Sequence, residues 1–223
     1  MLTVKELFSS DKSAAADFLR RFDYPWEALA HIRDFVIGYG KALAQDEYNE
    51  ISPCVWVHKS ARIAQSAFLG APCVIGEGSE VRHGAFIRSS ALIGKNCVVG
   101  NSTEIKNAIL FDNVQVPHYN YVGDSILGYK AHMGAGAITS NVKSDKTPVV
   151  IRAENESVET GLKKFGAILG DYVEVGCNCV LNPGTVIGKN TTVYPLSSVR
   201  GEIPSDCIFK SADNIVRKES VNG

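Results

Sequence analysis

The sequence predicts a mainly β protein: a left-handed parallel β-helix of six-residue repeats, with a short helical segment at its N-terminus. Three observations support this fold. A large apolar residue recurs at every sixth position, a small residue often stands two positions before it, and glycine or a polar residue often follows it. The first run of large residues comprises Val57, Ile63, Leu69, Ile75, Val81, Ile87, Ile93, Val99, Ile105 and Phe111. The second comprises Leu169, Val175, Leu181, Ile187, Val193 and Val199, and its phase is shared by Leu127, Met133 and Thr139.

A period of six residues fits a flat-faced coil that turns a corner after each repeat. Three such faces close a coil of about 18 residues, in which each large residue stacks on those above and below. Glycine or Asn at a corner eases backbone conformations with positive φ. A helix of 3.6 residues per turn and a meander that alternates with period two both fail to place these residues on one side.

Six cysteines occur, with no CxxC motif, and we expect them to be reduced. Cys73, Cys97 and Cys179 fall at the small inward positions of the repeat, so a core role accounts for them without redox or metal chemistry. We therefore predict no metal site.

The bulk composition excludes some classes of function. The net charge of −1 argues against general affinity for nucleic acid or anionic membrane. The first residues show no signal-peptide pattern, and no apolar run approaches the roughly 18 residues of a membrane span. We expect a cytoplasmic protein.

The repeat also predicts the organisation of the chain. Helical spacing marks residues 1–50, with Pro25 suited to a first helical turn, and the β-helix is expected over 51–210. A polar C-terminal tail is expected over 211–223. The phase of the repeat changes across 113–124, and a polar insertion interrupts it at about 142–165. Long excursions from a rigid scaffold often carry function, so we expect the site at these interruptions.

Two cations indicate a phosphate site. Arg88 and Lys106 each follow a large apolar residue directly and lie 18 residues apart, which is one full coil. Stacked like charges are unfavourable unless an anion lies between them, and a guanidinium beside an ammonium suits a phosphate. The alternative is that both are solvated and screened by Glu80 or Glu104.

His118 is the candidate general base. It lies where the repeat changes phase, and a histidine with an ordinary pKa of about 6.5 can take a proton at neutral pH. Acyl transfer to an amine needs such a base, because an ammonium has no lone pair for attack. The alternative is a structural histidine that caps a turn.

Two segments resemble a known family. TEIKNAILFDNVQVPHYNYVGDSILGYKAHMGAGAITSN (103–141) resembles the acetyltransferase domain of the bifunctional N-acetylglucosamine-1-phosphate uridyltransferase/glucosamine-1-phosphate acetyltransferase. ETGLKKFGAILGDYVEVGCNCVLNPGTVIG (159–188) is similar to the archaeal-type bifunctional sugar-1-phosphate nucleotidyltransferases. The resemblance covers about 55–208 and implies a homotrimer, with sites between subunits, that transfers acetyl from acetyl-CoA to the amine of an amino-sugar 1-phosphate.

The resemblance also implies roles for particular residues. His118 matches the family's general base, and Tyr121 and Asn141 match residues beside the amine. Arg88 and Lys106 match the sugar-phosphate ligands, and Lys164 matches a lysine that reaches the site from a neighbouring subunit. An acetyl-CoA groove is implied along the later coils, near Ala135, Ala167, Cys177 and Pro195.

The sequence departs from the family in two ways. Helical residues stand where a nucleotidyltransferase domain would be needed, so uridyl transfer is not predicted and a separate nucleotidyltransferase is a candidate partner. The position of an asparagine in the bacterial site is His132 here. The identity of the amino sugar, glucosamine or galactosamine, therefore stays open, and glucosamine is the first expectation.

Two other classes of function compete with an acetyltransferase. One is a non-catalytic sugar-phosphate-binding or assembly protein, which would need none of the predicted site residues. The other is a metal-dependent hydratase of the γ-carbonic-anhydrase type, which would need a close H-x4-H pair that the sequence lacks.

Overall fold

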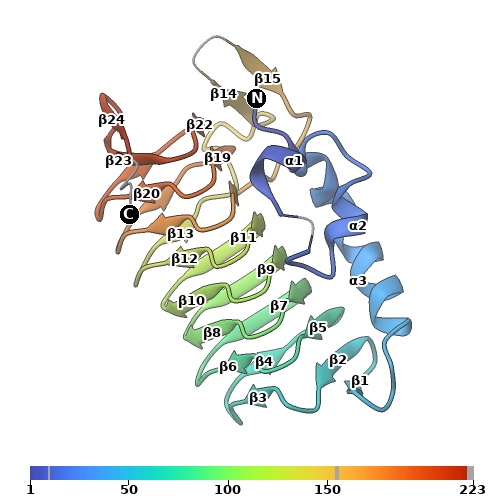
Figure 1. Cartoon of the computed structure of the whole chain (residues 1–223). Helices are drawn as coiled ribbons and strands as arrows, with labels where there is room; N and C mark the ends of the chain where they lie inside the picture. Colours follow the sequence, from blue (N-terminus) through green and yellow to red (C-terminus); the bar gives the residue numbers. More distant parts are fainter. Residues whose placement is uncertain (10, 154–155, 220–223) are drawn as a thin grey trace.

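The computed structural model describes residues 1–9, 11–153 and 156–219. They form a parallel β-solenoid of about eight turns, with short helices along one side (Figure 1). The predicted β-helix with its helical N-terminal segment is therefore confirmed. Among the described residues, no helix has both the length and the apolar character that crossing a bilayer requires.

The strands stack on three faces. Face one holds β2 (Val55–His58), β5 (Cys73–Ile75), β16 (Ala167–Leu169), β19 (Thr185–Ile187) and β22 (Glu202–Ile203). Face two holds β3 (Arg62–Ile63), β6 (Glu80–Val81), β8 (Val98–Asn101), β10 (Gln115–His118), β12 (His132–Met133), β17 (Glu174–Val175), β20 (Thr192–Val193) and β23 (Cys207–Ser211). Face three holds β4 (Phe68–Leu69), β13 (Ile138–Thr139), β18 (Val180–Leu181) and β21 (Ser198–Val199). Three longer strands start on face three and turn onto face one: β7 (Phe86–Ile93), β9 (Glu104–Leu110) and β11 (Tyr121–Leu127).

The core consists of columns of apolar side chains, one column for each face. On face one, directly paired residues form the column Val57, Ile75, Ile93, Leu110, Leu127, Leu169, Ile187 and Ile203. All of these are buried. The columns follow the predicted six-residue runs, because only a stacked position removes a large apolar side chain from water in every coil.

The phase of the repeat changes earlier than the sequence predicted. Phe111 was expected in the column, but Leu110 occupies it, only five residues after Ile105. A second five-residue step separates Val122 from Leu127. Phe111 is buried all the same, since its ring lies 4.8 Å from that of Phe8 in the N-terminal segment.

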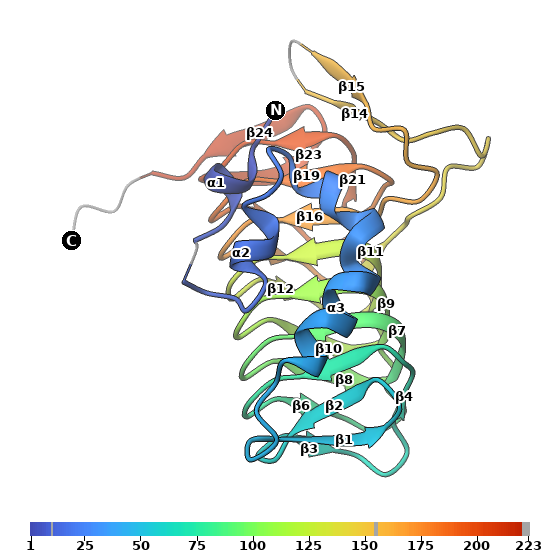
Figure 2. The same cartoon turned by 90° about the vertical axis from the view of Figure 1, so that its right-hand side faces the viewer.

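The N-terminal helices cover face one (Figure 2). They are α1 (Val4–Leu7), α2 (Ala16–Leu19), the 3-10 helix η1 (Pro25–His31) and α3 (Ile32–Lys41). After them β1 (Tyr48–Ser52) pairs antiparallel with β2, so the end of the segment expected to be helical is a strand. The ring of Trp26 in η1 lies 6.2 Å from that of Phe165, where the insertion returns to the solenoid.

Two hairpins leave the regular coil. The insertion at 142–165 contains β14 (Val150–Arg152) paired antiparallel with β15 (Ser157–Glu159), and Val149 and Ile151 of this region are buried. At the C-terminal end, β24 (Asn214–Arg217) pairs antiparallel with β23. The expected polar tail over 211–223 is thus partly a strand, because backbone groups there bond to β23, and residues 220–223 lie outside the described residues.

Ile105, in the apolar column of face three, gives a test of the stacked core. Ile105 is fully buried between coils, whereas Ile63, in the first coil of face two, is only half-buried. Ile105→Ala should lower the free energy of unfolding by about 2–5 kcal/mol through lost apolar burial and a residual cavity. Ile63→Ala should cost clearly less. Chemical denaturation of both variants measures the difference, and equal losses would contradict the column.

Candidate active site

One corner of the solenoid places His118 in line with three residues predicted for the cofactor. At this corner, between faces two and three, the carbonyls of His118, Ala135 and Cys177 accept hydrogen bonds from the next coil, and the pairing of β17 with β20 sets Pro195 beside Cys177. The bonds run from Gly136 N–H to His118 O (3.0 Å), from Asn178 N–H to Ala135 O (2.8 Å) and from Leu196 N–H to Cys177 O (2.9 Å). His118, Ala135, Cys177 and Pro195 therefore occupy equivalent positions in successive coils. We call this column the histidine corner.

The buried amide of Asn120 holds the histidine corner in place. Its Nδ2 donates to the carbonyls of Gly134 (2.8 Å) and Ala137 (3.0 Å), and its Oδ1 accepts from His118 N–H (3.1 Å). The coil can then turn directly after His118, where Tyr119 takes a positive φ of 51°. The imidazole of His118 is left exposed at the corner.

A second group of side chains lies at the next corner of the same coil, between faces three and one. Asn141 Nδ2 donates to Tyr121 Oη (3.2 Å) and to Asp124 Oδ2. Lys106 Nζ donates to both oxygens of Asp124, at 3.0 and 3.1 Å, and Asn107 Nδ2 donates to Asp124 Oδ1 at 2.9 Å. We call these five residues the aspartate cluster. It lies at the two five-residue steps, where β9 and β11 turn their corners.

Tyr121 lies across its own strand. A Cβ added to Gly123 would come within 2.4 Å of Tyr121 Oη, so only glycine leaves room for this ring. Burial raises the pKa of Tyr121, and the negative charges of Asp124 and Glu104 raise it further. The phenol is therefore neutral at physiological pH and can donate its proton in a hydrogen bond.

The two predicted phosphate-binding cations are each paired with a carboxylate. Arg88 Nη1 donates to Glu104 Oε1 (3.1 Å), and Lys106 pairs with Asp124. A register irregularity in β7 sets Ser89, not Arg88, opposite Lys106. The expected stacking of the two cations in one register is thus wrong, because the bulge moves Arg88 out of line. Glu104 as a partner of Arg88 matches the alternative stated from the sequence.

The remaining predicted residues lie in different settings. Lys164 is exposed at the end of the insertion, and the next residue, Phe165, donates its N–H to Asn141 O (3.0 Å). Ala167 is fully buried on face one and gives its N–H to Ser125 Oγ, so it offers no surface to a cofactor. His132 lies on face two, with Nδ1 2.9 Å from Glu174 Oε2.

Sequence reasoning did not select two buried polar side chains of these corners, Asp124 and Asn120, each 3% exposed. A signal for Asp124 was present, because it follows Lys106 by 18 residues and so should pair with it across one coil. It is also the one acidic residue in the buried run of β11. For Asn120 the sequence carries no comparable signal.

The cysteine prediction is confirmed for the three inward positions. Cys73, Cys97 and Cys179 are buried, and burial raises the pKa of the Cys73 and Cys97 thiols to about 12. Cys177, on the histidine corner, is exposed. Reagents reach exposed thiols and not buried ones, so Cys177 is far more accessible to them than the core cysteines.

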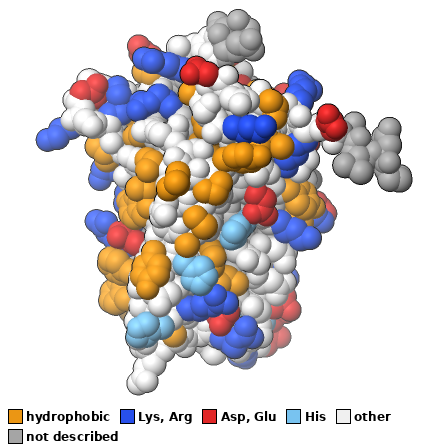
Figure 3. All heavy atoms as spheres, turned by 90° about the vertical axis from the view of Figure 1, so that its left-hand side faces the viewer, with side chains coloured by type: hydrophobic (Ala, Val, Ile, Leu, Met, Phe, Trp, Pro, Cys, Tyr) orange, Lys and Arg blue, Asp and Glu red, His pale blue; other side chains and the backbone are white. Residues whose placement is uncertain are grey.

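The side of the solenoid away from the N-terminal helices carries histidines among exposed hydrophobic side chains (Figure 3). The exposed hydrophobic residues near the histidine corner include Phe68, Phe86, Tyr119 and Leu196. The rings of Phe68 and Phe86 meet edge to face at 5.4 Å on face three. Exposed aromatic pairs of this kind are typical of surfaces that contact a partner or ligand.

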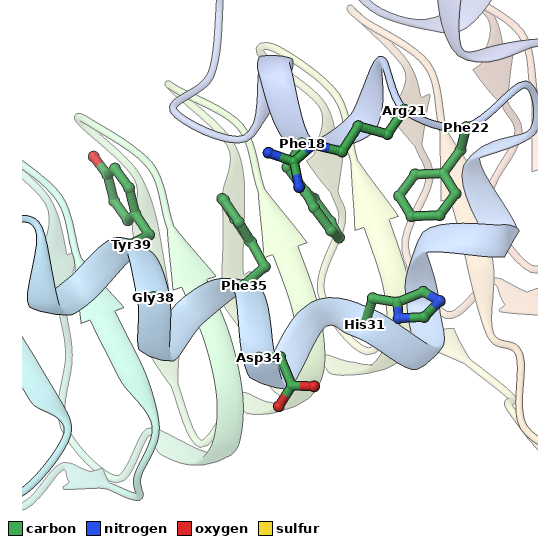
Figure 4. A pocket seen from close by; sticks show the side chains of 8 residues that line it. All are labelled: Phe18, Arg21, Phe22, His31, Asp34, Phe35, Gly38 and Tyr39. Carbon is green, nitrogen blue, oxygen red and sulfur yellow. The ribbon is translucent and has the colours of Figure 1, made fainter.

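A pocket of about 530 Å³ lies elsewhere, between α2 and α3. Phe18 stacks on Phe35 with ring centroids 4.3 Å apart, and Phe22 stacks on His31 at 5.7 Å (Figure 4). The residues lining this pocket include none of the predicted site residues. The candidate site is therefore the surface between the two corners and not this pocket.

The fold defines a β-solenoid protein, and its candidate site residues lie mainly at coil corners. The sequence profile of the GMPPB C-terminal domain family matches residues 72–188, more than half of the chain, and the protein belongs to this family. Curated relatives include the bifunctional protein GlmU of Methanococcus aeolicus, 34% identical over 113 residues, which are 51% of this chain and 27% of that protein. The bifunctional sugar-1-phosphate nucleotidylyltransferase/acetyltransferase of Sulfurisphaera tokodaii is 30% identical over 47% of this chain and 26% of that protein. The matched part thus spans about a quarter of these relatives, and the predicted family resemblance is confirmed.

Solved structures with a similar chain course are more distant in sequence. PerB from Caulobacter crescentus, in complex with CoA and GDP-perosamine, is 18% identical over 73% of this chain and 56% of that chain, with a TM-score of 0.39. The UDP-N-acetylglucosamine acyltransferase of Francisella novicida is 18% identical over 70% of this chain and 65% of that chain, with a TM-score of 0.43.

Asn120 gives a test of how the histidine corner is held. Asn120→Ala should lower the free energy of unfolding by about 1–3 kcal/mol, because two buried carbonyls and one N–H lose their partner. Asn101→Ala, at the same corner one coil earlier, removes only an acceptor for Ser102 Oγ and should cost less. Thermal and chemical denaturation compare the two variants. An Asn120→Ala protein as stable as wild type would refute the anchoring role.

Proposed function

We propose that the protein is an acetyl-CoA-dependent N-acetyltransferase acting on an amino-sugar 1-phosphate, with glucosamine-1-phosphate as first candidate. The observation that carries the proposal is the histidine corner. His118, which is exposed, stands in one column with the half-buried Ala135 and the exposed Cys177 and Pro195, and the aspartate cluster occupies the next corner. The printed name of the Sulfurisphaera tokodaii relative, a sugar-1-phosphate nucleotidylyltransferase/acetyltransferase, supports it.

In the proposed reaction, His118 accepts a proton from the amine of the sugar. The amine nitrogen attacks the carbonyl carbon of the thioester, the N–C bond forms, and the C–S bond breaks. The leaving thiolate takes up the proton from the imidazolium, so the histidine returns to its neutral form. Backbone N–H groups at the corner would stabilise the oxyanion.

The cofactor would extend from His118 along the later coils of the histidine corner. Ala135, Cys177 and Pro195 lie in line there, and Cys177 and Pro195 are exposed. Small side chains let a ligand approach the backbone of these corners closely. The buried Ala167 has no part in this arrangement.

Arg88 and Lys106 would hold the phosphate of the sugar. Arg88 is 54% exposed at its side chain and uses one guanidinium nitrogen on Glu104. A guanidinium carries more N–H donors than this contact uses, so it can bind a phosphate as well. Lys164 is a further candidate phosphate ligand, because it directly precedes Phe165, whose N–H donates to Asn141 O.

We also infer a homotrimer, with a separate nucleotidyltransferase as a candidate partner. Face three exposes Phe68 and Phe86, and a second copy packed there would remove them from water. It would also bring new side chains to the surface between the two corners.

The decisive test is release of CoA thiol from acetyl-CoA with a panel of amino-sugar 1-phosphates. His118→Ala should lower kcat at least about 10²-fold, because the general base is lost. His83→Ala is the matched control: it removes an exposed histidine from the same corner two coils earlier and should leave kcat unchanged. Full activity of His118→Ala would exclude the assigned base. No turnover by the wild-type protein with any sugar would favour a non-catalytic binding protein.

The cofactor path predicts ligand protection of one cysteine. Cys177 should react quickly with a maleimide in the folded protein, and saturating CoA should slow this reaction because the ligand covers the corner. Cys54, partly exposed near the first coil, should react at a rate that CoA does not change. Mass spectrometry of labelled peptides assigns each site. Labelling of Cys177 that ignores CoA would place the cofactor elsewhere.

A further inference from the structure

Asp124 is a buried carboxylate, and both of its oxygens accept hydrogen bonds from side chains of the protein. Only 5% of its side chain is exposed, and its oxygens accept from Lys106, Asn107 and Asn141. Its own backbone carbonyl accepts from Gly166 N–H (2.9 Å), at the end of the insertion. Such complete satisfaction fixes the carboxylate rigidly.

The cluster is held from several parts of the chain. Asn107 Nδ2 donates to Leu29 O (3.1 Å) in η1 as well as to Asp124, so the N-terminal helices support the carboxylate from behind. Phe165, which donates its N–H to Asn141 O, stacks on Trp26. The aspartate cluster is therefore the point where η1, β9, β11 and the insertion meet.

The carboxylate determines the direction of the neighbouring hydrogen bonds. An ionised carboxylate only accepts, so Asn141 must turn its NH2 group toward Asp124. The second N–H of that group points to Tyr121 Oη. Because Tyr121 Oη accepts here, its own proton is available to another acceptor. Asn141 Oδ1 receives no hydrogen bond from the described part of the chain and is left to accept from a ligand.

We propose that Asp124 is the positioning residue that gives Asn141 and Tyr121 opposite hydrogen-bonding roles toward the substrate. Asn141 Oδ1 accepts a hydrogen bond from an N–H of the amino group. This bond keeps the lone pair of the amine nitrogen directed at the thioester carbon. The Tyr121 phenol donates to an oxygen, either of the sugar or of the reacting carbonyl. This assignment rests on the proposed acetyl transfer, and it predicts that the direction of these bonds matters as much as their presence.

Two variants separate direction from simple structural support. Asp124→Asn removes the obligatory acceptor, so the amide of Asn141 can turn over, and kcat should fall about 10²-fold, as for loss of an oriented donor. The KM for acetyl-CoA should change less than about twofold, because its corner is untouched. The exchange Asp124→Asn with Asn141→Asp restores one carboxylate and one N–H···O bond, but with the direction reversed. Its melting temperature should recover toward that of wild type, while kcat stays low.

The matched control is Asp112→Asn, a half-buried carboxylate at another corner that accepts from Lys95 N–H. It should leave kcat unchanged. Wild-type kcat in Asp124→Asn, or recovered kcat in the exchange variant, would overturn the positioning role while acetyl transfer by the wild-type protein still stands.

A measurement without substrate tests the same inference if the wild-type protein transfers no acetyl group. The side-chain amide signal of Asn141, assigned by its loss in Asn141→Asp, should show both protons hydrogen-bonded and slow to exchange in the wild-type ¹⁵N spectrum. In Asp124→Asn this signal should move to the position of a free amide. An unchanged signal would overturn the inference regardless of the activity.

Discussion

Stacking of one coil on the next is the interaction on which the rest of this structure depends. Each inward apolar side chain is buried only because equivalent residues lie above and below it, and the backbone bonds of each coil are completed by its neighbours. Coils must therefore repeat closely in length, and corners must fall one above another. Side chains at corners then form straight columns, which is how His118 and Cys177, 59 residues apart, come to share one edge.

The polar site lies where this regularity is locally relaxed. Two coils lose one residue at the same corner, at Asn107 and at Asp124, and both residues take positive φ there, 49° in each case. Asn and Asp tolerate this conformation better than larger residues do. The shortened corners bring Lys106 and Asp124 together, and Gly166, where the insertion returns to the solenoid, donates its N–H to Asp124 O.

Almost all of the fold could be predicted from the sequence, because burial in a stacked coil requires an apolar residue at fixed intervals. The prediction misplaced one phase change, since Leu110 and Phe111 are both apolar and either could fill the column. The site was less visible. Spacing could place Arg88, Lys106 and Asp124 on one corner, but the bulge that moves Arg88 depends on backbone geometry that no residue pattern reveals. The role of Asn120 depends on two backbone carbonyls of the next coil. Every residue has such a carbonyl, so the sequence does not indicate which ones accept a hydrogen bond from a side chain.

The contact between Leu29 and Asn107 bears on how separable the parts of this protein are. A solenoid is commonly regarded as a self-contained module onto which other segments are added. Here a carbonyl of η1 shares the amide group of Asn107 with Asp124, and the ring of Trp26 rests on Phe165 beside Asn141. The helix η1 thus supports the aspartate cluster through these two contacts. Substitutions in the two parts should be energetically coupled, and exchange of the helical segment with a relative would alter the chemistry of the coil.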